Sequence, residues 1–164
     1  MITRTVLFLT VFAALQLGWQ YGSGSEVGRR VIEGGVVAPA AAVIGVLTPV
    51  LGVRAEGNAL RASDGGLRVV NGCDGMDALL LLAAGIVVAP LSLRARLGAL
   101  AAGVPLVYAL NLLRILALFY ARRAGPAAFD LWHSLLGPVL MVIAILGYFH
   151  VWIERWTPDI ARRH

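Results

Sequence analysis

Long apolar runs are the feature that most constrains this chain, because a stretch of about 20 apolar residues is long enough to cross a lipid bilayer. About five such runs are separated by short segments that contain arginine, glycine and proline. Hydrophobic residues make up 59% of the chain, above the roughly 45–50% of soluble domains. The sequence predicts an all-α, polytopic membrane protein, a single helix bundle over residues 1–164. The expected spans are about 6–19, 36–53, 76–90, 97–120 and 131–153.

The first apolar run has the length of a signal-peptide core, and Arg4 precedes it. The small, polar stretch Tyr21-Gly-Ser-Gly-Ser25 follows, but no convincing cleavage site lies at the right distance. We therefore expect a retained first span and keep cleavage as the alternative. Glu26 to Glu33 is predicted to be a charged connector to the second span.

The longest polar segment runs from Arg54 to Gly72. Asp64-Gly-Gly66 is a turn signal. Leu67 to Val70 is predicted to be a short strand, paired with Val53 to Leu60 in a small hairpin before the third span. The hairpin is either an arm that presents the following residues or a substrate, or a simple connection.

The charge pattern argues against a nucleic-acid partner. The net charge is +5, and all 14 basic residues are arginines that lie in short clusters between the apolar runs. Such clusters are typical of loops that flank membrane spans. One cysteine excludes an internal disulfide and a multi-cysteine metal site, and no metal or organic cofactor is expected.

Cys73 is that single cysteine, and it lies in the stretch Asn71-Gly-Cys-Asp-Gly75, just before the third apolar run. Small residues on both sides allow backbone or a substrate to approach the sulfur closely. The residue is either a nucleophilic thiol at the N-terminus of a membrane helix or an inert small hydrophobic residue in a turn.

Two further polar side chains lie within or at the edge of predicted spans, where ionisable groups are costly and often functional. Arg114 lies about six residues, roughly 9 Å, before the end of the fourth span, with Asn111 on the same helical face. It either snorkels to the interface or faces the bundle, and we favour the second. His133 opens the fifth span, where Asp130 is placed to orient its ring. Alternatively, His133 is an ordinary interfacial histidine.

The order of the spans predicts that Cys73, Arg114 and His133 lie at one membrane face, because the chain crosses after Cys73 and crosses back before Arg114. A thiolate is nucleophilic, and an adjacent cation and a helix N-terminus lower the pKa of a thiol. His133 can take the thiol proton and return it to a leaving amine. Arg114 can stabilise a thiolate or an oxyanion. Asp74 opposes thiolate formation unless its carboxylate points elsewhere.

These residues resemble the exosortase/archaeosortase family of membrane-embedded cysteine transpeptidases. Three blocks carry the resemblance, in the family's order: Asn71-Gly-Cys73-Asp-Gly75, Asn111-Leu-Leu-Arg114-Ile115 and His133-Ser-Leu-Leu-Gly137. They fall within about 67–149, roughly half of the chain. The short length is similar to that of compact members such as the exosortase H type.

The resemblance implies that Cys73 is the nucleophile, Arg114 the invariant basic residue and His133 the third catalytic residue. We predict supporting or substrate-binding roles for Asn71, Asn111 and Asp130. The implied partners are exported proteins with a C-terminal sorting signal, made of a short motif, a membrane helix and a basic cluster. Cleavage at the motif would precede transfer to a membrane lipid or surface acceptor. This chain departs from the family at Asp74, where a small or neutral residue is usual.

Sorting substrates are met after translocation, so the resemblance implies an inner-membrane protein whose active site faces away from the cytoplasm. Five spans then place the N-terminus on the outer side, with Arg29, Arg30, Arg94, Arg96 and the tail arginines inside. The outer loops carry almost as many arginines, so the charge count leaves the orientation open.

The leading hypothesis is therefore a membrane-embedded cysteine protease and transpeptidase. A non-catalytic membrane scaffold or assembly partner is the alternative, which Asp74 beside the thiol favours. A small transporter with Arg114 in its pathway is poorly supported, because the five predicted spans hold only this one arginine.

Overall fold

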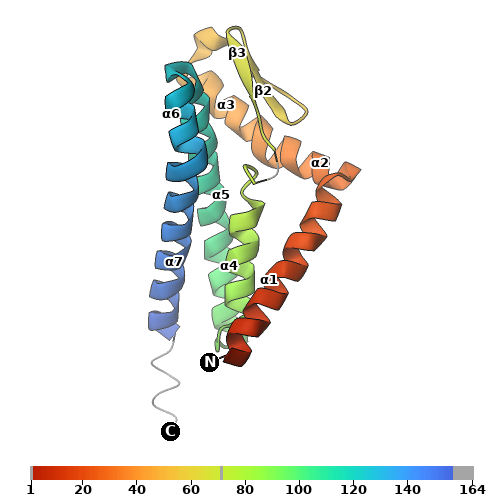
Figure 1. Ribbon diagram of the computed structural model, residues 1–164, viewed down its shortest axis with the longest axis vertical. Helices are drawn as coiled ribbons and strands as arrows, with labels where there is room; N and C mark the ends of the chain where they lie inside the picture. Colours follow the sequence, from red (N-terminus) through yellow and green to blue (C-terminus); the bar gives the residue numbers. More distant parts are fainter. Residues whose placement is uncertain (1, 71, 157–164) are drawn as a thin grey trace.

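The structure is a computed structural model that describes residues 2–70 and 72–156. It is a helical bundle with a small antiparallel sheet at one end, so the predicted all-α membrane bundle is confirmed (Figure 1). Among the described residues, four helices are long and apolar enough to span a membrane: Ile2–Ser23, Glu26–Leu47, Leu93–Ala124 and Pro126–Trp156. The helix Met76–Val88 is apolar but shorter, about 20 Å at 1.5 Å per residue.

α1 (Ile2–Ser23) packs antiparallel along α4 (Met76–Val88). Near the C-terminal end of α1, the indole N–H of Trp19 donates a hydrogen bond to Asp74, which lies just before α4. Near the N-terminal end of α1, Arg4 lines a cavity together with Pro90, which lies just after α4. α1 is longer than the predicted span at both ends, because the polar residues that flank the apolar run continue the same helix.

The polar segment before α4 forms three short antiparallel strands: β1 (Arg54–Glu56), β2 (Ala59–Ala62) and β3 (Gly65–Arg68), in the order β1-β2-β3. The predicted strand and turn are present, but the strand begins two residues earlier and pairs with β2. Leu60 lies opposite Leu67 in that pair, and both side chains are buried against α3 and α5. The sheet therefore anchors the chain that leads to Cys73.

The C-terminal half is a helical hairpin. α5 (Leu93–Ala124) begins at Ser92, whose side-chain oxygen accepts the backbone N–H of Ala95. α5 ends at Gly125, which has φ of 133°. The return helix starts immediately after it, as α6 (Pro126–Leu131), a π-helical turn η3 (Trp132–Leu136) and α7 (Gly137–Trp156). These helices are longer than the predicted spans because only one residue separates them, not the ten residues 121–130 that lie between the predicted spans.

The prediction that Glu26 to Glu33 is a charged connector is wrong, because this segment is helical. α2 (Glu26–Ile32) continues through the π-helical turn η1 (Glu33–Val37) into α3 (Ala38–Leu47). The predicted second span therefore starts too late. It also ends too late: the helix stops at Leu47, since Pro49 excludes the helical conformation from the residue before it.

Local contacts explain why the charged residues continue this helix. The side-chain oxygen of Ser25 caps α2 by accepting the backbone N–H of Gly28. Glu26 forms ion pairs with Arg29 and Arg30, which lie one turn further on. The charges therefore cover an exposed helix surface rather than mark a loop.

Both ends of the α2–α3 helix lie at the end of the bundle that carries Cys73. The start of α2 lines a cavity with the β1–β2 turn, and Thr48 after α3 is 3.1 Å from the hydroxyl of Tyr120 near the end of α5. The helix runs across this end (Figure 1). The expected alternation of five crossings is therefore wrong here. The N-terminus lies at the end opposite Cys73, and Arg29 and Arg30 lie at the same end as Cys73.

The apolar core has two main parts. One part joins α3, the sheet and the C-terminal half of α5 around Ile44, Leu60 and Phe119, beside Cys73. The other part joins α4, α5 and α7 around Leu82 and Ile145, nearer the opposite end. The first part holds the loop before α4 in place against α5.

Candidate active site

Cys73, Arg114 and His133 come together at one end of the bundle, from three different elements. The sulfur of Cys73 lies 3.6 Å from Nδ1 of His133 and 4.0 Å from Nη2 of Arg114. Cys73 precedes α4 by three residues, Arg114 lies in α5, and His133 lies in η3. The spatial grouping that the sequence predicted is present in the structure.

The loop that carries Cys73 is shaped by glycines. Gly72 and Gly75 have φ of 88° and 82°, a left-handed conformation that costs glycine little. A Cβ on Gly75 would lie 2.6 Å from Cγ of Asn111, so the loop packs directly on α5. Asn111 is 4% exposed, and among the described residues its Oδ1 has no hydrogen-bond partner. The side chain of Asn111 therefore packs against the loop that carries Cys73.

Arg114 faces the bundle, as the sequence favoured. Its Nη1 donates a hydrogen bond of 3.0 Å to the carbonyl oxygen of Gly72, which fixes the guanidinium beside the neighbouring sulfur. Its Nε is buried and has no hydrogen-bond partner among the described residues. A Cβ on Gly137 would lie 2.8 Å from that Nε. The missing side chain at Gly137 therefore makes the space that the arginine occupies.

His133 lies in the π-helical turn η3, a distortion that is frequently found at functional sites. Its ring stacks on Phe129, with the centroids 5.4 Å apart and the planes 8° from parallel. The guanidinium of Arg122 lies 5.9 Å from the centre of the same Phe129 ring. Phe129 thus holds the imidazole with Nδ1 toward the thiol.

One of the predicted supporting residues, Asp130, is not part of this grouping. Asp130 is exposed, and none of the described hydrogen bonds or ion pairs joins it to His133. The thiol, rather than a carboxylate, is the polar group beside the Nδ1 of His133. Asn71 lies outside the described residues.

Asp74 points away from the thiol. Its carboxylate accepts hydrogen bonds from the indole N–H of Trp19, at 3.0 Å, and from the backbone N–H of Met76, at 3.1 Å. Burial raises the pKa of Asp74, and these two hydrogen bonds lower it in part. The side chain therefore ties α1 to the N-terminus of α4.

The pKa of Cys73 is raised, not lowered. Burial is the largest cause; the charge of Arg114 opposes it, and the charges of Asp74 and Asp77 add to it. The charge of Arg114 thus lowers the pKa of the thiol, as expected of an adjacent cation, but burial outweighs it.

A cavity of about 180 Å³ opens beside the sulfur. It lies between the chain that follows β3, the C-terminal half of α5 and the α6–η3 segment. Its lining residues are Leu67, Arg68, Val69, Val70, Cys73, Ile115, Leu118, Phe129 and His133. Both Cys73 and His133 border it, so a reacting group placed there would be in reach of sulfur and imidazole.

The described residues hold no group of three or more histidine, cysteine, aspartate or glutamate side chains that could hold a metal ion. A thiol and an imidazole border the cavity, and the guanidinium of Arg114 lies 4.0 Å from the sulfur. These are suited to nucleophilic attack, proton transfer and charge stabilisation.

Sequence reasoning missed several residues that shape the site. Trp19 gave no signal, because a tryptophan near the end of a span is usually an interfacial anchor. Phe129 falls between the predicted spans 97–120 and 131–153, where the sequence gives no sign that it stacks on His133. Gly72 and Gly137 belong to the blocks that carry the family resemblance, but only the folded chain shows that both contact Arg114.

Comparison with known proteins gives one match. A family model described as transmembrane exosortase (Exosortase_EpsH) matches residues 7–150. No curated protein and no solved structure is similar enough to match. The matched region includes Cys73, Arg114 and His133, and it covers most of the chain.

Proposed function

The chain belongs to the transmembrane exosortase family, and from this premise we propose that it is a cysteine peptidase and transpeptidase that processes C-terminal sorting signals of exported proteins. The observation that carries the proposal is the contact of one thiol with one imidazole and one guanidinium. Cys73 lies within 4.0 Å of both Arg114 and His133. These are the groups that acyl transfer through a thioester needs.

The first half-reaction forms a thioester. Nδ1 of His133 takes the thiol proton while the sulfur of Cys73 attacks the carbonyl carbon of the scissile peptide bond. Arg114 stabilises the negative charge that develops on the carbonyl oxygen. The tetrahedral intermediate collapses when the C–N bond breaks, and His133 returns the proton to the leaving amine. The leaving fragment carries the membrane helix of the sorting signal.

The second half-reaction frees the enzyme. A nucleophilic hydroxyl or amine of a lipid or surface acceptor attacks the thioester carbon, and His133 takes its proton. The C–S bond breaks, and the proton passes to the sulfur of Cys73. Water in place of the acceptor gives hydrolysis by the same steps.

The raised pKa of Cys73 fits this proton transfer. A buried thiol that stays protonated does not react with small oxidants and electrophiles as a free thiolate does. It becomes nucleophilic when His133 takes the proton in the presence of a bound carbonyl. Attack and proton transfer are therefore coupled at the imidazole 3.6 Å away.

The proposal is tested with a co-expressed reporter that ends in a motif, an apolar helix and an arginine cluster, taken from a protein of the same cell. Cys73→Ala, Arg114→Ala and His133→Ala are each expected to abolish its processing. His150→Ala is the control, because His150 is exposed near the other end of α7, beside Glu154. Unchanged processing in Cys73→Ala would remove the proposed mechanism.

A non-catalytic scaffold remains the second candidate, because a protonated, buried thiol is also what a structural cysteine has. The two functions separate in one experiment. A scaffold requires the bundle but not the sulfur, so Cys73→Ala would then support surface attachment of the reporter as well as the wild-type chain does.

We place the end of the bundle opposite Cys73 in the cytoplasm. Among the described residues, that end carries Arg4, Arg94, Arg96 and Arg155 against Glu154 alone. The Cys73 end carries acidic residues and arginines in near balance. An excess of arginine is typical of the cytoplasmic side, so Cys73 would face the exported part of a substrate.

A further inference from the structure

Resting on the proposed function, we propose that a groove along α4, between α1 and α7, is the docking site for the membrane helix of the sorting signal. The groove is open to the side and leads to Arg114. The substrate helix would lie in it parallel to α4 and α7, with the scissile bond at the Cys73 end.

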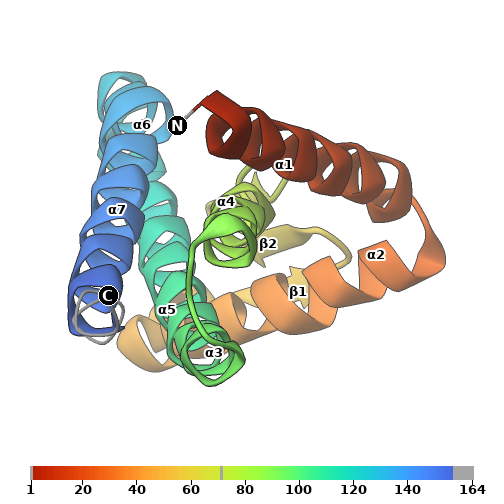
Figure 2. The same ribbon diagram turned by 90° about the horizontal axis from the view of Figure 1, so that it is seen from below.

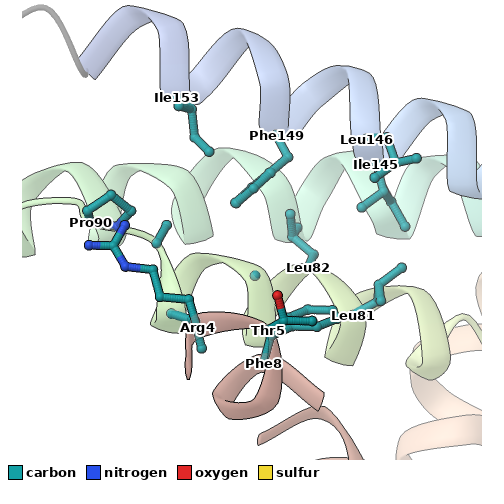
Figure 3. A pocket seen from close by; sticks show the side chains of 13 residues that line it. Arg4, Thr5, Phe8, Leu81, Leu82, Pro90, Ile145, Leu146, Phe149 and Ile153 are labelled. Carbon is teal, nitrogen blue, oxygen red and sulfur yellow. The ribbon is translucent and has the colours of Figure 1, made fainter. Parts of the chain in front are cut away.

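Two neighbouring cavities form the groove. Their volumes are about 380 and 300 Å³. Both are lined by Leu81 of α4 and Ile145 of α7, so one continues into the other. Figure 3 shows the larger cavity, with Phe8 of α1 and Phe149 of α7 on opposite sides of α4 residues. Figure 2 shows that α1 and α7 lie on different sides of α4.

The two ends of the groove differ in chemistry. The smaller cavity reaches the catalytic end, where Gly72, Asp77 and Arg114 line it. Gly72 is the residue before Cys73, so this end is adjacent to the nucleophile. The larger cavity ends at Arg4 and Pro90, at the opposite end of the bundle (Figure 3). The groove therefore follows α4 from one end to the other.

The lining of the groove suits a helix. The walls between the two ends are apolar, and the α4 side contributes the small residues Ala78 and Gly85, which permit close approach of another helix in lipid. Val142 on the α7 side is 45% exposed, so α1, α4 and α7 leave this face uncovered. α1 and α7 both pack on α4 but diverge around it, which leaves room for an added helix.

Continuity with the catalytic residues selects the occupant. An acyl chain would also enter an apolar groove, but nothing in a lipid requires it to end beside Arg114. The substrate helix is covalently joined to the motif that Cys73 attacks. Docking it in the groove holds the scissile carbonyl near the sulfur, which raises the effective concentration of the reacting groups. The arginine cluster that follows the helix would then lie beyond Arg4, at the level of lipid phosphates.

The test uses two neighbouring residues of α7. Val142 lines the groove, whereas Ile143 is 61% exposed and lines neither cavity. Val142→Trp fills the groove, and Ile143→Trp adds the same bulk to the lipid-facing side. The purified variants are assayed on a peptide with the motif, the helix and the arginines, and on a peptide with the motif alone. We expect Val142→Trp to lower kcat/KM on the helix-bearing peptide about tenfold.

The same experiment expects no change for Val142→Trp on the motif-only peptide, and none for Ile143→Trp on either peptide. Equal rates for the two variants on the helix-bearing peptide would overturn the docking site. An equal loss of kcat/KM on both peptides for Val142→Trp would also overturn the docking site, because it would indicate that an acceptor lipid occupies the groove.

A cross-linking experiment separates docking from catalysis. Because Cys73 is the only cysteine of the chain, Cys73→Ala gives a thiol-free, inactive background. Val142→Cys in this background should form a disulfide with a cysteine in the middle of the probe helix, and Ile143→Cys should not. Cross-linking at both positions or at neither contradicts the docking site. Docking without cleavage by the wild-type chain would instead contradict the proposed function.

Discussion

At the scale of single residues, the site depends on how each polar group around Cys73 is held. Arg114 is fixed by the carbonyl oxygen of Gly72, and His133 is fixed by stacking on Phe129. Asp74, the departure from the family pattern, forms its hydrogen bonds to other groups. Its charge still raises the pKa of the thiol, although burial is the larger cause. The site therefore combines a buried thiol with an imidazole held 3.6 Å away.

The pH dependence of alkylation tests this electrostatic balance. The pKa of Cys73 is raised, so its rate of reaction with iodoacetamide should increase at higher pH than for an ordinary cysteine. Arg114→Ala removes the charge that lowers this pKa and should move the profile to still higher pH. Asp74→Asn removes a charge that raises the pKa and should move the profile to lower pH. A shift in the reverse direction for either variant would contradict the assigned causes.

At the scale of elements, the π-helical turn η3 and the start of α7 set the positions of His133 and Arg114 together. η3 presents His133 toward the thiol, and Gly137 at its end allows α7 to pass close to Arg114. A helix with a larger residue there would have to move away from α5. The block from His133 to Gly137 therefore acts as one structural unit, because both its first and its last residue have a part in the geometry of the site.

Gly137→Ala tests this unit. The added methyl group would lie 2.8 Å from Nε of Arg114 and from the carbonyl oxygen of Trp132, so the guanidinium or the helix has to shift. We expect processing of the reporter to fall about tenfold or more, because small displacements of catalytic groups are costly. Gly147→Ala on the same helix is the matched control, since a methyl group there meets nothing within 4 Å. Equal activity of the two variants would show that the close approach has no role.

At the scale of the whole molecule, the α2–α3 helix decides the topology. It lies across the end of the bundle that carries Cys73. The N-terminus of α1 and the C-terminus of α7 therefore both lie at the opposite end. The sheet and this helix together form a layer over the catalytic end. This layer supports Cys73 from one side, while α6 and η3 close the site from another.

Accessibility of introduced cysteines tests this topology in intact cells. In the Cys73→Ala background, Arg29→Cys and Arg94→Cys each provide a single thiol in an exposed part of the chain. We expect a membrane-impermeant maleimide to label Arg29→Cys from outside, and Arg94→Cys only after permeabilisation. Protection of Arg29→Cys together with labelling of Arg94→Cys would reverse the orientation. Labelling of both from the same side would contradict the fold.

Much of the site could be predicted from the sequence, because the grouping of Cys73, Arg114 and His133 needs only α4, α5 and the return helix. These three elements cross in alternation, as uninterrupted apolar runs with short connections usually do. The elements that failed prediction are those with mixed character. The charged start of α2 is helical because Ser25 caps it and Glu26 pairs along it, which composition alone does not distinguish from a loop.

The amino-acid sequence alone determined that this chain is a bundle of apolar helices with a thiol, a guanidinium and an imidazole at one end. Lipid leaves an apolar run of sufficient length few alternatives to a helix, because its backbone groups must bond internally. The tertiary structure alone decided three other properties: the path of the α2–α3 helix, the raised pKa of Cys73 and the groove that leads to Arg114. Each of these properties arises from packing between segments that are distant in the chain. The sequence of a single segment does not show which other segments will bury it or approach it closely.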